Sequence, residues 1–194
     1  MIIISVIPAR CGSKRVKDKN IRMLGRYPLL VWSILTSEEA KKISGIYLST
    51  DSNAYGYIGS KCGAEVIYRS PEICGDNAGD LSVLQNLIAK GIEFDLVVYL
   101  RPTTPFRDFR LVDVAIDEMV DNDFTSLRSV EEMTESAFKC FSKEGGIFLS
   151  PLMGDMDQAN IPNQLVPKTY RGNGYVDIYR RSQIESGDLY GPQC

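Results

Sequence analysis

The sequence predicts an α/β fold: a doubly wound, mainly parallel sheet with helices on both faces. Short apolar runs alternate with amphipathic stretches of about ten to fifteen residues, which is typical of strand–helix–strand units. The first run, Ile2 to Ile7, is apolar almost throughout, as expected for a strand buried on both faces. Polar loops at 8–20, 69–79 and 101–108 each follow a predicted strand, so we expect them to meet at the ligand-binding edge of the sheet.

The predicted elements follow one another regularly as far as Val130. Pro28 stands near the first turn of a helix, a position that proline favours. Thr50-Asp51-Ser52 offers capping side chains to the next helix, and Asp80 offers one to the helix after it. Further strands are predicted at 46–49, 65–68, 96–100 and 124–130, and helices at 28–41, 53–61, 80–90 and 109–120.

The alternation stops between residues 131 and 172. This segment is richer in Gly, Pro, Met and polar residues, and its periodicity is poor. A long segment that is neither polar nor periodic is typical of a flap or a dimerisation arm. A strand is predicted again at 174–179, so we expect one domain over 1–194 with an excursion at 131–172. Four apolar residues of the excursion are expected to need burial: Phe138, Phe141, Ile147 and Phe148.

The composition restricts the class of protein. Apolar residues make up 44% of the chain, enough for a core, and no apolar run approaches the roughly 20 residues that span a bilayer, so no membrane partner is expected. Five scattered cysteines without a C-x-x-C pair predict free thiols and a cytoplasmic location. Histidine is absent, which excludes histidine triads and histidine-ligated zinc. The net charge of −3 disfavours a nucleic-acid partner.

The loop after the first strand is densely basic. Between Pro8 and Asn20 it holds five cationic residues and one anionic residue, a local charge of +4. It matches neither the dinucleotide fingerprint nor the P-loop. Its chemistry still suits a triphosphate, since Ser13 and Asn20 can donate hydrogen bonds and Arg10 and Lys19 can bracket the phosphates. The alternative is a solvated basic surface loop, which fits less well with five cations at the ligand-binding edge.

Four motifs occur in order along the chain. They are Pro8-Ala9-Arg10-x-Gly12-Ser13-Lys14 with Lys19-Asn20, Arg69-Ser70-Pro71-Glu72 followed by Asp76, Leu100-Arg101-Pro102-Thr103-Thr104-Pro105-Phe106-Arg107, and Gln164-Leu165-x-Pro167 with Asn173-Gly174. Together they resemble the motifs of the acylneuraminate cytidylyltransferases, the CMP-sialic acid synthetase family, over almost the whole chain. The resemblance implies a Rossmann-like nucleotidyltransferase domain, in which the excursion is a dimerisation arm that reaches over the partner's sugar site.

The resemblance also implies a reaction. CTP and a nonulosonic, sialic-acid-like α-keto acid sugar would give a CMP-sugar and pyrophosphate, with Mg²⁺ as cofactor, in a homodimer. By matching position, Arg10 and Lys19 would be catalytic and would neutralise the triphosphate and the leaving group. The other nucleotide-binding residues would be Ser13, Lys14, Asn20, Arg69, at the cytosine end, and Thr103. The sugar-binding residues would be Arg101, Gln164, Asn173 and Asp177.

The chain departs from the family pattern at three places. Arg101 replaces the glutamine of the family's Pro-Thr-Ser-Pro loop, and Asn163 replaces the arginine of its Arg-Gln pair. Both positions belong to sugar recognition in the family, which favours the hypothesis that Arg101 binds the sugar carboxylate. The family's metal-binding Asp-x-Asp segment would follow Cys194, so the metal ligands stay unassigned. We therefore expect either a truncated sequence or a chain that binds nucleotide with poor turnover.

Two alternatives remain open from the sequence. One is a cytidylyltransferase for another acid sugar, such as 3-deoxy-manno-octulosonate, and the other is a non-catalytic nucleotide-binding module. Nothing in residue spacing distinguishes cytosine from uracil as the base.

Four positions near the motifs have a structural and a functional interpretation. Cys11 is expected to be an untuned thiol rather than a nucleophile. Asp51 is expected to cap a helix rather than to bind a ligand. Asp76 and Asp80 could approach the base or the metal, and capping and loop solvation explain them nearly as well.

Overall fold

A computed structural model describes residues 1–70, 73–75 and 79–194 and divides the chain into two compact units. The first unit comprises residues 1–128 and 174–194, and the second comprises residues 129–173. The second unit begins two residues before the excursion expected at 131–172 and ends one residue after it.

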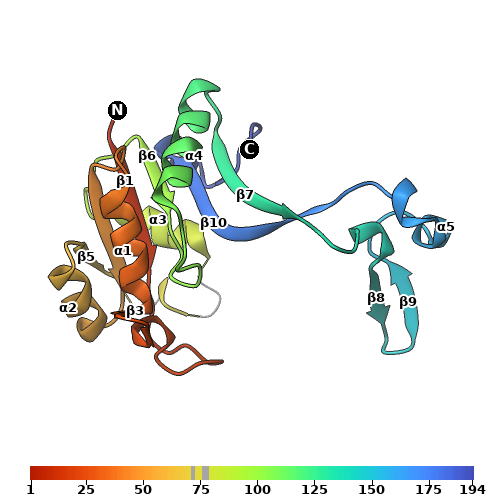
Figure 1. Cartoon of the computed structure of the whole chain (residues 1–194), viewed down its shortest axis with the longest axis horizontal. Coiled ribbons are helices and arrows are strands. Elements are labelled where there is room, and N and C mark those ends of the chain that lie inside the picture. Colours follow the sequence, from red (N-terminus) through yellow and green to blue (C-terminus); the bar gives the residue numbers. More distant parts are fainter. Residues whose placement is uncertain (71–72, 76–78) are drawn as a thin grey trace. The chain divides into compact units, whose positions relative to one another are not determined.

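A six-stranded sheet forms the centre of the first unit (Figure 1). The strand order is β5-β4-β1-β6-β10-β7, in which β1 pairs in parallel with β4 and β6, and β4 pairs in parallel with β5. In this sheet β10 pairs antiparallel with β6, and the three parallel pairings confirm the prediction of a mainly parallel sheet. Its strands are β1 (Ile3–Pro8), β4 (Gly45–Thr50), β5 (Glu65–Tyr68), β6 (Leu96–Tyr99), β7 (Ser126–Glu132) and β10 (Tyr170–Arg180).

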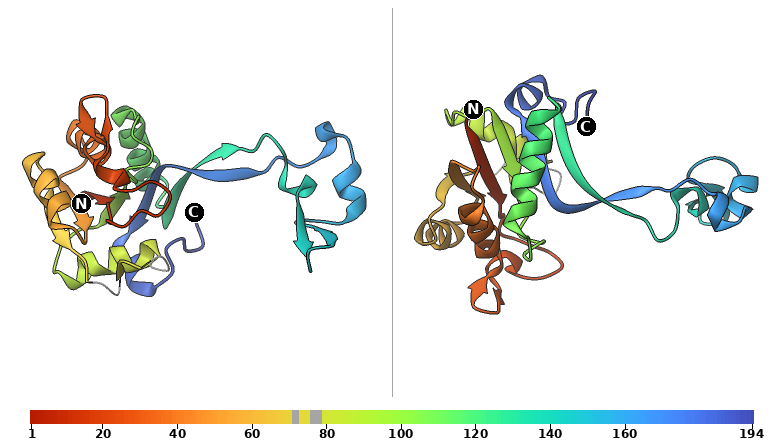
Figure 2. Two further views of the ribbon diagram at one scale, coloured as in Figure 1. Left: turned by 90° about the horizontal axis from the view of Figure 1, so that it is seen from below. Right: turned by 45° about the horizontal axis from the view of Figure 1, so that its top comes forward.

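Helices cover both faces of this sheet, as the sequence predicts. Helices α1 (Leu29–Glu39), α2 (Asn53–Lys61) and α4 (Phe109–Asp121) contribute to one core, and α3 (Asp80–Ala89) and α6 (Arg181–Ser186) contribute to the other. The left view of Figure 2 shows α1 and α4 on one side of the sheet and α3 on the opposite side. Within the described residues, no helix is long and apolar enough to cross a membrane.

The apolar first strand belongs to both cores. Ile3 and Ile7 face the core under α1 and α4, whereas Ile4 and Val6 face the core under α3. Successive side chains of a strand point to opposite faces, so a strand between two helical layers needs apolar residues at consecutive positions. This burial on both faces explains why the sequence of β1 is an apolar run.

The helix caps differ in part from those expected. Ser52 caps α2 by accepting a hydrogen bond from the Tyr55 N–H, at 3.4 Å. The expectation that Asp51 is the cap is wrong, because its carboxylate bonds to the basic loop instead. Asp80 is the first residue of α3 rather than its cap; Gly79 holds the cap position and has no side chain to donate or accept.

Several short elements were not predicted. They are a hairpin of β2 (Met23–Leu24) and β3 (Tyr27–Pro28), the 3-10 helix η1 (Lys19–Ile21) and α6. None is long enough to show a hydrophobic period.

The second unit is built around a β-hairpin. Strands β8 (Phe141–Glu144) and β9 (Phe148–Pro151) pair antiparallel, and the unit also contains α5 (Met156–Asn160). Gly145 and Gly146 turn the hairpin with φ of 58° and 76°, values that glycine adopts without strain. Two of the apolar residues expected to need burial are exposed in the single chain, Ile147 at 77% and Phe141 at 41%.

Candidate active site

A basic pocket opens where the loops leave β1 and β6. Its volume is about 730 Å³, and all of its lining residues belong to the first unit. Six cationic side chains and one carboxylate line it, so the pocket suits a polyanion. The cations are Arg10, Lys14, Arg15, Lys19, Arg69 and Arg101, and the carboxylate is Asp80.

The pocket brings together eight of the eleven site residues predicted from the sequence. They are Arg10, Ser13, Lys14, Lys19, Asn20, Arg69, Arg101 and Thr103. Asp177 lies in the first unit behind Arg101, whereas Gln164 and Asn173 belong to the second unit and are exposed. Asn173 accepts a hydrogen bond from the Ser129 hydroxyl, at 2.7 Å. The predicted motif residues Pro71, Glu72 and Asp76 lie outside the described part of the chain.

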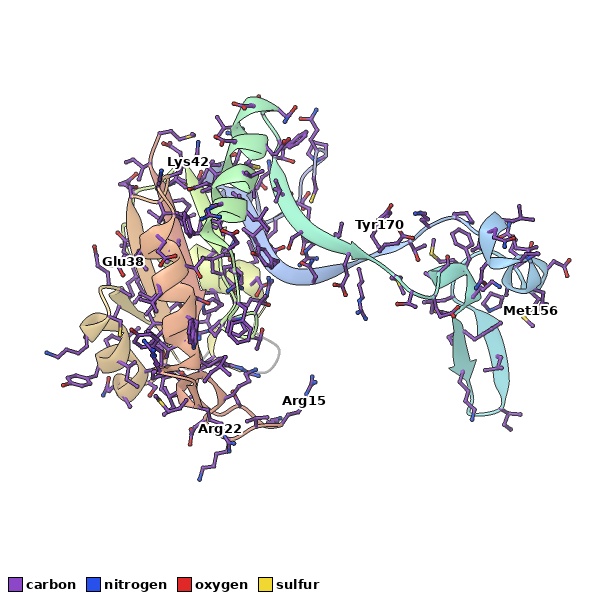
Figure 3. The ribbon with its side chains drawn as sticks, viewed as in Figure 1. Arg15, Arg22, Glu38, Lys42, Met156 and Tyr170 are labelled. Atoms are coloured by element: carbon purple, nitrogen blue, oxygen red, sulfur yellow. The ribbon has the colours of Figure 1, made fainter. Side chains whose placement is uncertain are left out.

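The basic loop is held at its base by a buried amide. Asn20 is 5% exposed and its Nδ2 donates to the carbonyl oxygen of Arg10, at 3.0 Å. Gly12 has φ of 71°, in the left-handed region, and Arg15 stands at the outer end of the loop (Figure 3). The side chains of Arg10 and Lys19 therefore enter the pocket from the two ends of a loop whose ends are fixed to each other.

A second anchor of the loop is the carboxylate of Asp51. It accepts hydrogen bonds from the Cys11 N–H, at 2.7 Å, and from the Cys11 thiol, at 3.3 Å. Burial alone raises the pKa of Asp51, but these two hydrogen bonds bring it below its usual value. The hydrogen bond from the Cys11 thiol to Asp51, together with burial, raises the pKa of Cys11. The thiol is therefore a donor to Asp51, in agreement with the expectation that it is no nucleophile.

Arg69 combines burial with an unused donor. It is 9% exposed and its Nη2 donates to the Ser49 carbonyl oxygen, at 3.3 Å. Its Nε is buried and has no hydrogen-bond partner among the described residues. A buried donor without an acceptor costs about 1–3 kcal/mol, so an acceptor on a ligand in the pocket would stabilise this arrangement.

An ion chain forms one wall of the pocket. Arg101 forms two ion pairs, one between its Nη1 and Asp177 and one between its Nη2 and Asp80. Arg128 adds a second cation to Asp177, with its Nε 3.2 Å from Oδ1. The side chain of Asp177 is 1% exposed, so this buried charge has two guanidinium partners. Burial alone lowers the pKa of Arg101, but Asp177 and Asp80 raise it above its usual value.

Arg107 ties the 101–108 loop to its neighbours. Its guanidinium donates to the carbonyl oxygens of Tyr175, Gly174 and Arg101 and to the hydroxyl of Ser33 on α1. Burial among these neutral acceptors lowers the pKa of Arg107 to about 10. Arg107 therefore fixes the backbone at Arg101 relative to β10 and α1.

The structure adds site residues that sequence reasoning missed. Arg15 lines the pocket, and Arg128 and Arg107 support its wall. Arg128 could have been noticed as a charged residue within the strand predicted at 124–130, as Asp177 was within the strand predicted at 174–179. Their pairing depends on the strand order, which the sequence does not specify.

The Mg²⁺ that the resemblance implies has no ready ligand set here. Among the described residues, no group of three or more acidic or thiol side chains could hold a metal ion. Both carboxylates at the pocket wall, Asp80 and Asp177, are bonded to Arg101. These residues by themselves therefore do not fit a magnesium centre.

The sequence matches a known family model over almost its full length. The model is described as cytidylyltransferase and matches residues 4–185. Among curated proteins, the N-acylneuraminate cytidylyltransferase of Oncorhynchus mykiss is 30% identical over 190 residues, which are 95% of this chain and 43% of the relative. The CMP-N,N′-diacetyllegionaminic acid synthase of Legionella pneumophila is 28% identical over 191 residues, which are 95% of this chain and 80% of the relative. The chain thus spans less than half of the trout relative.

A solved structure has the same fold. A CMP:2-keto-3-deoxy-manno-octonic acid synthetase complexed with CTP aligns with a TM-score of 0.74 over 96% of this chain and 77% of that protein. The two sequences are 17% identical, so the match shows the fold alone.

Proposed function

The chain belongs to the cytidylyltransferase family, among the acylneuraminate cytidylyltransferases, and from this premise we propose that it transfers CMP from CTP to an acid sugar. The acceptor would be a nonulosonic, sialic-acid-like α-keto acid. Its anomeric hydroxyl attacks the α-phosphorus of CTP, the bond from that phosphorus to the bridging oxygen breaks, and pyrophosphate leaves.

The observation that carries this proposal is the basic pocket at the carboxyl edge of the sheet. It collects six cations in a chain of net charge −3. A triphosphate has the charge that such a pocket attracts, and the pocket volume of about 730 Å³ lies in the range of small-molecule sites. The cytosine base is proposed from the family match, because no described contact distinguishes it.

The nucleotide side of the proposal assigns roles to the basic loop. Arg10 and Lys19 enter the pocket from both ends of the loop and stabilise the charge that develops on the leaving pyrophosphate. Ser13, Lys14 and Thr103 line the same pocket and contact the nucleotide. Asn20 helps to position Arg10, because its side-chain amide donates a hydrogen bond to the Arg10 carbonyl oxygen.

Arg69 is proposed to contact the cytosine end of the nucleotide. Its buried Nε lacks an acceptor among the described residues, and an acceptor on the ligand would supply one.

On the sugar side, Arg101 is the proposed carboxylate ligand. It is the pocket cation that stands on the 101–108 loop, and Asp177 holds it in place. Gln164 and Asn173 are proposed as further sugar contacts on the family pattern, and both are exposed in the second unit.

Mg²⁺ is proposed as a cofactor on the family resemblance alone. Since the described carboxylates do not form a magnesium centre, the ion would be held mainly by phosphate oxygens of CTP, as is common for Mg²⁺. Its contribution would be to neutralise phosphate charge.

A homodimer is also proposed, with the second unit as the interface. Several of its apolar side chains are exposed in the single chain, and a partner surface would bury them. They are Ile147, Leu149, Leu152, Leu165 and Tyr170, with exposures from 57% to 77%. A cytoplasmic location is proposed because the five cysteines are scattered along the sequence and include no C-x-x-C pair.

The test is a panel of pyrophosphate-release assays. Each of the four NTPs is paired with N-acetylneuraminic acid, N,N′-diacetyllegionaminic acid and 3-deoxy-manno-octulosonate, with and without Mg²⁺. Turnover only with CTP and a nonulosonic acid is expected. Turnover with 3-deoxy-manno-octulosonate alone would show that this sugar is the acceptor instead. CTP binding without any turnover would contradict the enzyme assignment.

A further inference from the structure

The two carboxylates on Arg101 are held very differently. Asp177 is 1% exposed, lies within β10 opposite Tyr99, and is also bound by Arg128. Asp80 is 34% exposed, and its further partner among the described residues is the Tyr99 hydroxyl, which donates to its Oδ1 at 2.9 Å. The inner contact of Arg101 is therefore fixed, and the outer contact is exchangeable.

The exchangeable contact faces the pocket. Arg101 and Asp80 both belong to the described lining, whereas Asp177 does not. Of the two terminal nitrogens of Arg101, Nη2 is paired with Asp80, which lines the pocket, and Nη1 is paired with Asp177, which lies outside that lining.

The charges of the ion chain also favour exchange over addition. Arg101 and Arg128 together neutralise Asp80 and Asp177. An added carboxylate would thus approach a neutral group and lie beside Asp80, where like charges repel. Once Asp80 leaves, Arg101, Arg128 and Asp177 together carry one net positive charge and attract the incoming carboxylate.

Asp80 has a place to go when it leaves Arg101. It is the first residue of α3, a ten-residue helix, and negative charge is favourable at a helix N-terminus. Its partial exposure lets water solvate the released carboxylate.

We propose that Asp80 is an internal stand-in for the substrate carboxylate on Arg101, and that an acid sugar binds by displacing it. The proposal rests on the proposed function, from which it takes the carboxylate of the acceptor. This makes Asp80 a specificity-determining residue. Sugars without a carboxylate cannot replace the ion pair between Asp80 and Arg101, and sugars with a carboxylate must compete with Asp80 for Arg101.

The test compares the Asp80→Asn variant with the wild type by calorimetry. N-acetylneuraminic acid and its C1 methyl ester are titrated into protein that is saturated with the α,β-methylene analogue of CTP, so that no transfer occurs. The variant is expected to bind the acid about tenfold more tightly, since a charge-assisted hydrogen bond no longer competes. Its affinity for the ester is expected to change less than about twofold.

Two controls separate this from a general loss of negative charge. Asp113→Asn removes a carboxylate of α4 that accepts from the backbone at Lys41 and Lys42, outside the pocket lining, and is expected to leave both affinities unchanged. The double variant Asp80→Asn with Arg101→Gln is expected to lose the gain, since the gain acts through Arg101.

Unchanged or weaker binding of the acid to Asp80→Asn would overturn the inference, and so would an equal gain for the methyl ester. Failure of the proposed function would be distinguishable from this result. The wild type would then neither bind an acid sugar nor release pyrophosphate, and the stand-in role of Asp80 would be refuted as well. Failure of the inference alone leaves the turnover of the wild type intact.

Discussion

At the scale of single residues, some side chains of the basic loop line the pocket and others are exposed to solvent. Lys19 lines the pocket, whereas Lys17 is exposed and absent from the described lining. Two lysines of one loop therefore form a matched pair for mutation.

Lys19→Ala is expected to lower kcat/KM for CTP by about a hundredfold to a thousandfold, because a preorganised positive charge at the leaving group is lost. Lys17→Ala is expected to stay within about twofold, since an exposed charge is screened by salt. Steady-state kinetics measures both, and thermal unfolding checks that both variants fold. Equal losses for the two variants would remove Lys19 from the site.

The Cys11 thiol offers a test of the loop anchor. Because its pKa is raised, first by the hydrogen bond to Asp51 and then by burial, less thiolate is present at about pH 8 than for an ordinary cysteine. Alkylation by iodoacetamide, mapped by mass spectrometry, is expected to be slower at Cys11 than at the exposed Cys194. Asp51→Asn is expected to accelerate labelling of Cys11. Fastest labelling at Cys11 in the wild type would contradict the anchor.

Asp177 is expected to contribute strongly to stability. Asp177→Asn leaves Arg101 and Arg128 without their shared buried carboxylate and should lower the free energy of unfolding by about 3–5 kcal/mol. Asp123→Asn is the control: its side chain is 93% exposed in an ion pair with Arg180, and its loss should cost less than about 1 kcal/mol. Urea denaturation measures both, and similar costs would mean that the ion chain adds little.

At the scale of elements, the helices and strands with a clear apolar pattern were predictable, and the elements without one were not. The predicted helix at 53–61 and strand at 65–68 coincide with α2 and β5, because apolar periodicity and turn residues mark both ends. The strand predicted at 174–179 in fact extends from Tyr170 to Arg180. The prediction missed the beginning of this strand because its first residues are mostly polar and all exposed. Polar residues carry no pattern that distinguishes a solvated strand from a loop.

Arg107 determines how the 101–108 loop is attached to the sheet. Arg107→Lys is expected to lower the free energy of unfolding by about 2–3 kcal/mol, because an ammonium group cannot reach the four acceptors of a planar guanidinium. Arg110→Lys, on the exposed side of α4, is expected to change it by less than about 0.5 kcal/mol. Denaturant unfolding decides, and a neutral Arg107→Lys would mean that the loop is held by its backbone alone.

At the scale of the whole molecule, the sequence predicted the basic loop but not how the charges of the ion chain pair with one another. Arg10, Lys14 and Lys19 follow one strand within a few residues, so their shared location could be inferred from charge and strand position. Asp80, Arg101, Arg128 and Asp177 meet only because α3, β6, β7 and β10 are neighbours in space. Partners separated by up to 76 residues leave no local pattern in the sequence.

The division into two units predicts that the first unit folds alone. The Ser129 hydroxyl and the Asn173 side-chain oxygen are 2.7 Å apart, so a Gly-Gly linker can replace residues 130–172. The shortened chain is expected to be a monomer in sedimentation equilibrium and to bind CTP within about threefold of the full chain, because every pocket residue remains. The full chain is expected to be a dimer. A shortened chain that still dimerises would place the interface on the first unit.

The central claim is that this chain moves the α-phosphate of CTP to an acid sugar, and isotope tracing tests it most directly. The wild type is incubated with N-acetylneuraminic acid and CTP that carries ³²P at either the α or the γ position. The α label is expected to appear in a CMP-sugar and the γ label in pyrophosphate. Transfer of the γ label to the sugar, or no transfer of either label although CTP binds, would contradict it.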